Sequence, residues 1–87
     1  MKELEKKLKA LSNKRRLAIV KYLKSTGRAS VGDIAGAIKL SYKATSKHLL
    51  ILSNAEIIEK EQISLTVFHF LPRTNDTLVK SVLSLMR

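Results

Sequence analysis

Residues 30–54 decide the fold, and they read SVGDIAGAIKLSYKATSKHLLILSN. Ser30, followed three positions later by an aspartate, is typical of a helix start and predicts a short helix over residues 30–38. Ser41 is a second capping residue and predicts a further helix over residues 42–54. Two short helices with only a brief turn between them indicate a helix-turn-helix.

The helix over residues 42–54 has two different faces when its residues are placed at helical spacing. The face that we expect to be buried holds Thr45, Leu49 and Leu52. The opposite face is mostly polar and basic, and it holds Lys43, Ser46, Lys47 and Leu50, with Tyr42 at the N-terminal end. If that end entered the major groove of DNA, this face would offer polar side chains to bases and phosphates. An ordinary amphipathic helix with a solvated face is the alternative.

Two more helices are predicted upstream. Leucines recur at helical spacing over residues 2–11 and predict an amphipathic helix with a narrow apolar stripe. The leucines of this stripe are Leu4, Leu8 and Leu11. Ser12 and Asn13 then supply the N-cap of a helix over residues 14–25, which ends at Gly27.

Downstream, the apolar pattern changes from that of a helix to that of strands. Residues 57–61 and 65–71 are rich in β-prone side chains, with a short turn between them. A last helix, apolar over a wide arc, is expected over residues 74–87 with Thr74 or Asn75 as its cap. The predicted order of elements is therefore α-α-α-α-β-β-α.

A hairpin directly after the second helix of a helix-turn-helix is the winged-helix arrangement. The expected fold class is accordingly mainly α with a small β-hairpin, a winged helix-turn-helix. The chain has 87 residues, enough for one modest hydrophobic core, so we expect a single domain over residues 1–87. No apolar run approaches the roughly 18–20 residues that span a bilayer, and the N-terminus is a charged helical pattern unlike a signal peptide. A soluble, cytoplasmic protein is the expectation.

Positive charge is concentrated in the first two thirds of the chain. Lys and Arg number 17 against 7 Asp and Glu, a net charge of +10. Residues 6–54 carry 12 of the basic side chains and one acid, Asp33, whereas residues 55–87 sum to zero. This distribution predicts a basic face for a polyanion. Charge alone leaves open a solvated surface, and equally a non-specific architectural or RNA-binding protein.

Several segments resemble the ArsR-type winged-helix repressors. Residues 11–23 are similar to the opening segment of that family, with an Arg-Leu pair followed by apolar residues at helical spacing. Residues 34–52 resemble its helix-turn-helix, including a Ser-x-His-Leu element at Ser46, and residues 55–71 resemble the approach to its wing and the second strand. The resemblance implies a regulator of transcription, a repressor that binds specific double-stranded DNA as a homodimer.

The chain also departs from the family pattern. Lys39 and Glu56 stand where glycine is usual, at turns that normally use a left-handed residue. Leu50 is apolar at a position that is commonly basic. The wing carries one basic residue, Lys60, between two glutamates, which weakens the expectation of strong contacts between wing and phosphates.

Two sets of functional residues follow from the helical faces and the resemblance. The predicted DNA-contacting residues are Lys39, Ser41, Tyr42, Lys43, Ser46, Lys47, His48, Lys60 and Gln62. His48 either contacts the DNA backbone or is a polar residue packed between helices. A core of this size leaves the apolar stripes of both terminal helices uncovered, which predicts a dimer interface. The predicted dimer residues are Leu4, Leu8, Leu11, Leu78, Val82 and Leu85.

Metal and enzyme chemistry are not expected. The chain has no cysteine, and residues 30–32 read Ser-Val-Gly where one metal site of the family has a Cys-x-Cys pair. The last helix holds Asp76 but no histidine for the other metal site. His69 alternates with two phenylalanines and is expected to face solvent from a strand. No phosphate-binding loop or nucleophile motif is present, so no cofactor is predicted.

One alternative comes from a different class of protein. Leu50 and Ile51, together with the acidic wing, would also suit a winged-helix protein–protein interaction module. Without the family's metal ligands, regulation would act through abundance, a partner protein or a small organic ligand.

Overall fold

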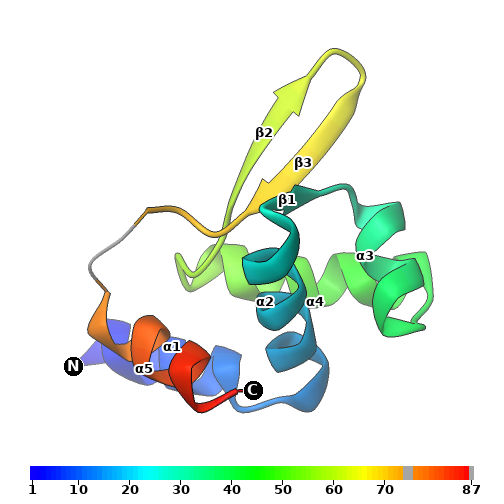
Figure 1. The fold of residues 1–87 in the computed structure, drawn as a ribbon. Helices are drawn as coiled ribbons and strands as arrows, with labels where there is room; N and C mark the ends of the chain where they lie inside the picture. Colours follow the sequence, from blue (N-terminus) through cyan, green and yellow to red (C-terminus); the bar gives the residue numbers. More distant parts are fainter. Residues whose placement is uncertain (74–75, 87) are drawn as a thin grey trace.

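The computed structural model describes residues 1–73 and 76–86, and it has the predicted mainly helical fold with a small β-hairpin. Its elements are α1 (Lys2–Leu11), α2 (Lys14–Thr26), β1 (Arg28–Ala29), α3 (Val31–Ile38), α4 (Tyr42–Asn54), β2 (Glu59–Ile63), β3 (Thr66–Phe70) and α5 (Thr77–Leu85). The hairpin of β2 and β3 projects from the helices as a wing, and α1 lies beside α5 at the other end of the molecule (Figure 1). The winged helix-turn-helix prediction is confirmed.

Side-chain caps start the helices where the sequence predicted them. The carboxamide oxygen of Asn13 accepts hydrogen bonds from two backbone N–H groups in the first turn of α2. Ser30 Oγ accepts from the N–H of Asp33 at 3.2 Å, and Ser41 Oγ accepts from the N–H of Ala44 at 3.1 Å. Each cap satisfies donors that the helix itself leaves unpaired, which fixes where α2, α3 and α4 begin.

The two turns on either side of α4 are built alike. Lys39 and Glu56 both lie in the left-handed region, with φ of 56° and 60°. In each turn the next residue donates its N–H to the carbonyl five positions back, Leu40 to Ala35 and Ile57 to Leu52, both at 3.0 Å. The positions that usually hold glycine therefore keep a left-handed conformation although they carry side chains.

The sheet has three antiparallel strands in the order β1-β3-β2, so β3 is the central strand. No local sequence pattern predicts the two-residue strand β1, which pairs Ala29 with His69. The first strand of the hairpin lies two residues further along the chain than expected, and the second is shorter by one residue at each end. β2 begins at Glu59, and the turn lies at residues 64–65 rather than 62–64. Ile57 and Ile58, which were expected to open the strand, are buried in the core instead.

The core joins all the helices. Its fully buried large side chains are Ile19, Val20, Leu23, Ile34, Thr45, Leu52, Ile57 and Ile58. Leu11 of α1 and Val79 of α5 also belong to this core, at 5% exposure each. The expectation that Leu11 is left over for a partner is therefore wrong, because the chain itself buries this leucine.

The two terminal helices are joined by a polar contact. Lys7 of α1 donates a hydrogen bond to the carboxylate of Asp76, and the two side chains form an ion pair. Asp76 is also the N-cap of α5, since it accepts from the N–H groups of Leu78 and Val79. The predicted caps Thr74 and Asn75 lie outside the described residues.

Candidate nucleic-acid interface

The helix α4 has the two faces that the sequence predicted. Thr45, Leu49 and Leu52 are buried, with exposures of 0 to 2%. The other side of α4 is open, with Tyr42 64% exposed at its start and Leu50 59% exposed. The polar residues between them are Lys43 and Lys47, which are exposed, and Ser46, which is half-buried. This open side is the centre of the candidate interface.

The open side of α4 is also free of negative charge. Residues 42–54 contain no acidic side chain, and Lys43 and Lys47 lie one helical turn apart on the exposed side. The helix N-terminus adds the positive end of its dipole. Backbone N–H groups at such an end, together with lysines, are suited to bind phosphate oxygens.

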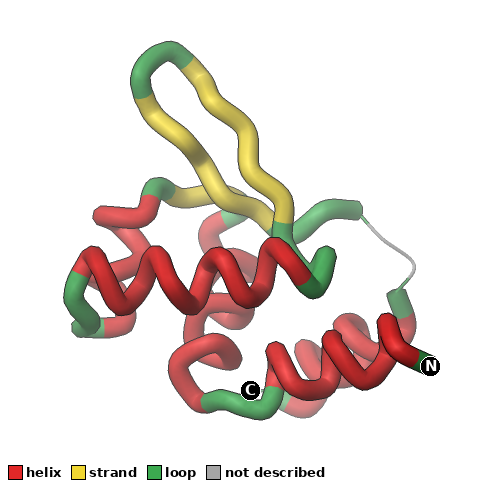
Figure 2. The backbone as a smooth tube through the Cα atoms, turned by 180° about the vertical axis from the view of Figure 1, so that it is seen from behind, coloured by secondary structure: helices red, strands yellow, loops and turns green. Residues whose placement is uncertain are grey.

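The wing stands next to this helix, as Figure 2 shows with α4 in front and the hairpin above it. Alternate residues of a strand point to opposite faces, and paired residues share a face. One face of the hairpin therefore holds Lys60 and Gln62 with their partners Val67 and His69, and the other holds Glu59 and Glu61 with Phe70 and Phe68. The acids and the cation of the wing are thus on opposite faces.

Contacts identify which face of the hairpin meets α4. Lys60 and His69 line a cavity of about 130 Å³ together with Ser46 and Leu50 of α4. On the other face, the guanidinium of Arg28 lies 3.8 Å from Glu61 Oε1 and 5.0 Å from the centre of the Phe68 ring. Glu61 is therefore turned away from the cavity beside α4, and Lys60 is turned toward it.

His69 does not face solvent, and that expectation was wrong. Its side chain is buried, with only 8% exposure, because β3 is the central strand and the helices cover its inner face. Burial lowers the pKa of this imidazole, and the charge of Lys60 lowers it further. His69 is consequently neutral at pH 7, and its buried side chain packs where the wing meets the helices.

His48 is set apart from the exposed lysines of α4. It is half-buried, and its Nδ1 lies 3.1 Å from a guanidinium nitrogen of Arg16 on α2. A guanidinium can only donate, so this Nδ1 accepts and the ring is neutral. Burial lowers the pKa of His48, and the charges of Arg16 and Arg15 lower it further. These contacts favour the interpretation of His48 as a polar residue packed between helices.

The remaining predicted DNA-contacting residues lie at the edges of this surface. Lys39 is exposed in the turn between α3 and α4. Ser41 is exposed too, but its hydroxyl oxygen already caps α4. Gln62 is exposed near the tip of the wing, where its side chain donates to the carbonyl of Ser64 at 3.2 Å. The tip itself is apolar, with Leu65 95% exposed.

Two arginines that support the interface were not singled out from the sequence. Arg16 binds His48 and also donates to the backbone carbonyls of Lys9 and Ala10, so it connects α1, α2 and α4. Its spacing from Ile19, Val20 and Leu23, which places it on their side of α2, could have revealed this inward orientation. Arg28 depends on strand pairing between distant segments, and no local pattern indicates it.

The predicted dimer residues divide into three groups. Leu4, Leu8 and Leu85 are exposed, at 43%, 48% and 81%. Leu78 and Val82 are half-buried against the chain's own core, and Leu11 is within it. Two exposed leucines on α1 and one on α5 thus remain as apolar surface on the two terminal helices.

Two classes of feature are absent from the residues that the structure describes. No three His, Asp or Glu side chains there lie close enough together to hold a metal ion. Within residues 1–73 and 76–86, none of the helices has the length and apolar character needed to cross a membrane.

The chain is similar in sequence and in fold to known proteins. Residues 13–60 match the sequence profile of a family described as "Bacterial regulatory protein, arsR family". The transcriptional activator HlyU of Vibrio cholerae is 34% identical over 79 residues, which are 91% of this chain and 69% of HlyU. The solved structure of HlyU from Vibrio cholerae superposes with a TM-score of 0.81 at 32% identity, over 97% of this chain and 87% of that one.

Two further solved structures have the same fold. The transcriptional repressor BigR from Xylella fastidiosa has a TM-score of 0.81 at 27% identity, and the match covers 98% of this chain and 84% of BigR. The fragment 1–100 of Mb0332 from Mycobacterium bovis, described as a homodimeric winged helix-turn-helix DNA-binding domain, has a TM-score of 0.83 at 21% identity. That match covers 97% of this chain and 75% of the fragment.

Proposed function

This chain belongs to the ArsR family of bacterial regulatory proteins, and on that premise we propose that it is a repressor that binds specific double-stranded DNA as a homodimer. The observation that carries the proposal is the shared orientation of α4 and the wing. The acid-free side of α4, with Lys43 and Lys47, lies next to the wing face that bears Lys60, while Glu59 and Glu61 are on the opposite wing face.

The residues divide between the two tasks of such an interface. Lys43, Lys47 and Lys60 would contact phosphates, which hold a protein on the duplex without reading sequence. Tyr42 and Ser46, at the N-terminal half of α4, would reach base edges in the major groove. Lys39, Ser41 and Gln62 would contact the backbone at the rim of this surface. His48 would act indirectly by holding α4 against Arg16.

A homodimer is supported by the apolar surface on the terminal helices. Leu4, Leu8 and Leu85 are exposed although they are large and apolar, and pairing them with a second copy across a two-fold axis would bury them. Leu78 and Val82 would complete the interface from the half-buried side of α5. In this proposal residues 1–87 are one domain whose terminal helices, α1 and α5, form the dimer contacts. The two copies of α4 would read half-sites about one helical turn of DNA apart.

Repression is the simplest outcome for a dimer of this size, because occupying a promoter is enough to block it. The relatives include an activator, HlyU, and a repressor, BigR. In vitro transcription from a promoter that carries the selected site shows directly whether the protein represses or activates. Action on a bacterial promoter would place the protein in the cytoplasm.

The experiment that tests DNA binding is selection from random duplex DNA, followed by salt titration of the recovered site. We expect a palindromic site and an affinity that falls steeply with salt. Lys43→Ala and Lys47→Ala should each weaken binding and flatten the salt dependence by about one released ion. Lys24→Ala is the matched control, since Lys24 is an exposed cation on α2 away from α4. If both α4 variants bind like the Lys24→Ala protein, the proposed interface is wrong.

A protein-interaction module is the second candidate, because Leu50 and Ile51 are 59% and 41% exposed on α4. A partner protein seated on these residues would bind with little dependence on salt, and duplex DNA would not compete with it. Leu50→Ser should abolish such binding. On DNA, the same substitution should remove at most a contact with a thymine methyl group. Competition by single-stranded RNA and unrelated duplex separates both candidates from non-specific nucleic-acid binding.

A further inference from the structure

A groove of about 590 Å³ runs between α2 and the C-terminal end of α3. Its α2 wall lies on the side of that helix opposite to the buried residues Ile19, Val20 and Leu23. None of the proposed DNA-contacting residues is among the described residues that line it. Figure 1 shows α2 in front of α4, and the opposite view in Figure 2 shows α4 in front of α2.

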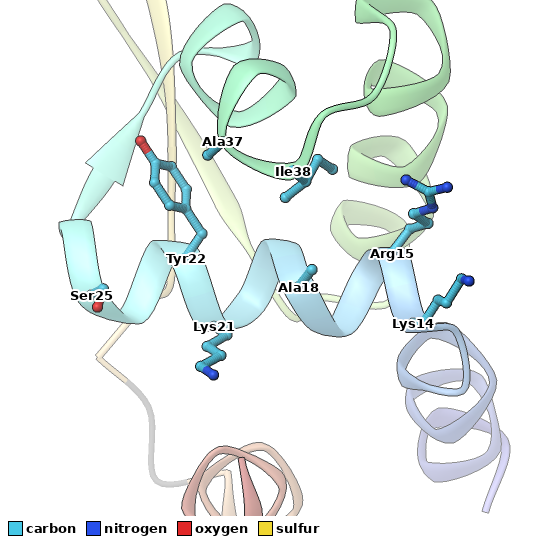
Figure 3. Close-up of a pocket in the computed structure, with 8 residues that line it drawn as sticks. All are labelled: Lys14, Arg15, Ala18, Lys21, Tyr22, Ser25, Ala37 and Ile38. Atoms are coloured by element: carbon cyan, nitrogen blue, oxygen red, sulfur yellow. The ribbon is translucent and has the colours of Figure 1, made fainter. Parts of the chain in front are cut away.

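The chemistry of the groove changes along its length (Figure 3). Lys14 and Arg15 stand at one end, at the start of α2. Ala18 and Ile38 face each other in the middle, with Ala37 beside them. Tyr22 and Ser25 lie toward the other end, which is about 16 Å away along the helix axis, and of these two only Tyr22 points its hydroxyl to the α3 side of the groove. The groove is thus cationic, then apolar, then hydroxyl-bearing.

No acidic side chain among the described residues neutralises the cationic end. None of the described residues lining the groove is acidic, and no carboxylate in residues 1–73 and 76–86 forms an ion pair with Lys14 or Arg15. Lys21 also lines the groove, but Figure 3 shows its side chain pointing away from α3. The charge that selects a ligand is therefore confined to one end.

We propose that this groove binds a linear amphipathic organic anion, a carboxylate with an aliphatic body. The carboxylate would lie between Lys14 and Arg15, and the body would cover Ala18, Ala37 and Ile38. A polar group at the far end would meet the hydroxyl of Tyr22. The volume lies within the range of small-molecule sites, and the small side chains of the two alanines leave the space for the aliphatic body.

The placement of charge favours a small molecule over an acidic protein segment. A helix lying in the groove would need cations along its whole length, whereas the two facing cations are at one end and the middle is apolar. A single carboxylate with an apolar body matches that pattern. The proposal does not depend on DNA binding, since its residues are distinct from those of the candidate interface.

Dodecanoate is the probe for this site, used below its micelle concentration and followed by methyl NMR of the alanines. We expect saturable shifts of the Ala18 and Ala37 methyl signals, while the signal of Ala55, which is buried at the end of α4 and does not line the groove, does not move. Dodecyltrimethylammonium has the same chain and the opposite charge and should leave both groove signals unchanged. Equal shifts with both compounds, or none with dodecanoate, would overturn the proposal.

Variants separate specific binding from adsorption to apolar surface. Replacing Lys14 and Arg15 together by glutamine should weaken dodecanoate binding by roughly tenfold or more, since two charge-assisted contacts are lost. Lys24→Gln is the matched control, because Lys24 is an exposed cation of α2 outside the groove. Ala18→Leu should fill the middle of the groove and abolish binding, with the fold checked by circular dichroism. An Ala18→Leu protein that folds and binds dodecanoate like the parent would contradict the site.

Discussion

α4 and the β2–β3 wing form the two halves of the proposed DNA-binding surface, but they are positioned by different means. α4 is fixed by a local cap at Ser41 and by a buried face that repeats at helical spacing. The wing has no comparable local support, since every residue of β2 is exposed. The two faces of the wing are oriented by the pairing of β2 with β3, by the pairing of β3 with β1 along its other edge, and by the contacts of Arg28. Local interactions orient the helix, and contacts between distant segments orient the wing.

The largest difference between the two regions should appear when one leucine is truncated in each. Leu52 of α4 is 0% exposed, so Leu52→Ala should lower the free energy of unfolding by about 3 kcal/mol. Leu65 at the wing tip is 95% exposed, and Leu65→Ala should change the free energy of unfolding by less than about 0.5 kcal/mol. Urea denaturation of both variants measures this. Similar losses for the two would mean that the wing tip is packed and that the contrast is wrong.

The same contrast explains what the sequence could predict. The caps at Asn13, Ser30 and Ser41 and the buried face of α4 are local features, and all of them were predicted correctly. The position of His69 was not, because it depends on β1, a two-residue strand whose pairing partner lies about 40 positions along the chain. Leu11 was misassigned for a related reason. A helical stripe shows which residues are apolar, but it does not show whether the chain itself or a partner covers them.

The faces of the wing illustrate this limit at the candidate site. In the sequence, Lys60 between Glu59 and Glu61 indicates a wing poorly suited to phosphate. In the sheet, alternation puts both acids on the face where Arg28 contacts Glu61, and it leaves Lys60 beside α4. The alternation itself was predictable. The direction in which each face points required the tertiary structure.

An intermediate effect is expected at the turns that flank α4, where Lys39 and Glu56 occupy left-handed positions. Lys39→Gly and Glu56→Gly should each stabilise the fold by about 0.5–1 kcal/mol, because glycine removes the steric cost of that conformation and only part of the gain is lost to chain entropy. Thermal and urea denaturation measure the gain. A loss of stability in either variant would show that its side chain makes a contact worth more than the strain.

These two substitutions should differ in their effect on the salt dependence of DNA binding. Lys39→Gly removes a cation at the rim of the proposed interface, so the salt dependence of DNA binding should flatten. Glu56→Gly removes an acid from the turn that leads into the wing and should leave that dependence unchanged. The pair therefore compares a turn that faces the duplex with one that does not.

The smallest effect near neutral pH concerns the two histidines, one in each region. The pKa of His69 in the wing and that of His48 in α4 are both lowered, in each case first by burial. A histidine whose pKa is lower in the folded than in the unfolded protein binds fewer protons when folded. Its stabilisation of the folded protein is therefore fully present above its ordinary pKa of about 6.5 and is lost as the pH falls below that value. The free energy of unfolding should therefore fall as the pH is lowered from 7.5 to 5.5, before most carboxylates titrate.

The two histidines differ in which neighbouring charges lower their pKa values. Lys60 lowers the pKa of His69, and Arg15 is among the charges that lower the pKa of His48. NMR titration of the imidazole signals should show that Lys60→Ala raises the pKa of His69 and leaves His48 unchanged, and that Arg15→Ala does the reverse. If Lys60→Ala moved both values, the wing and α4 would be electrostatically coupled. The separation between locally fixed helix and distantly fixed wing would then not extend to their charges.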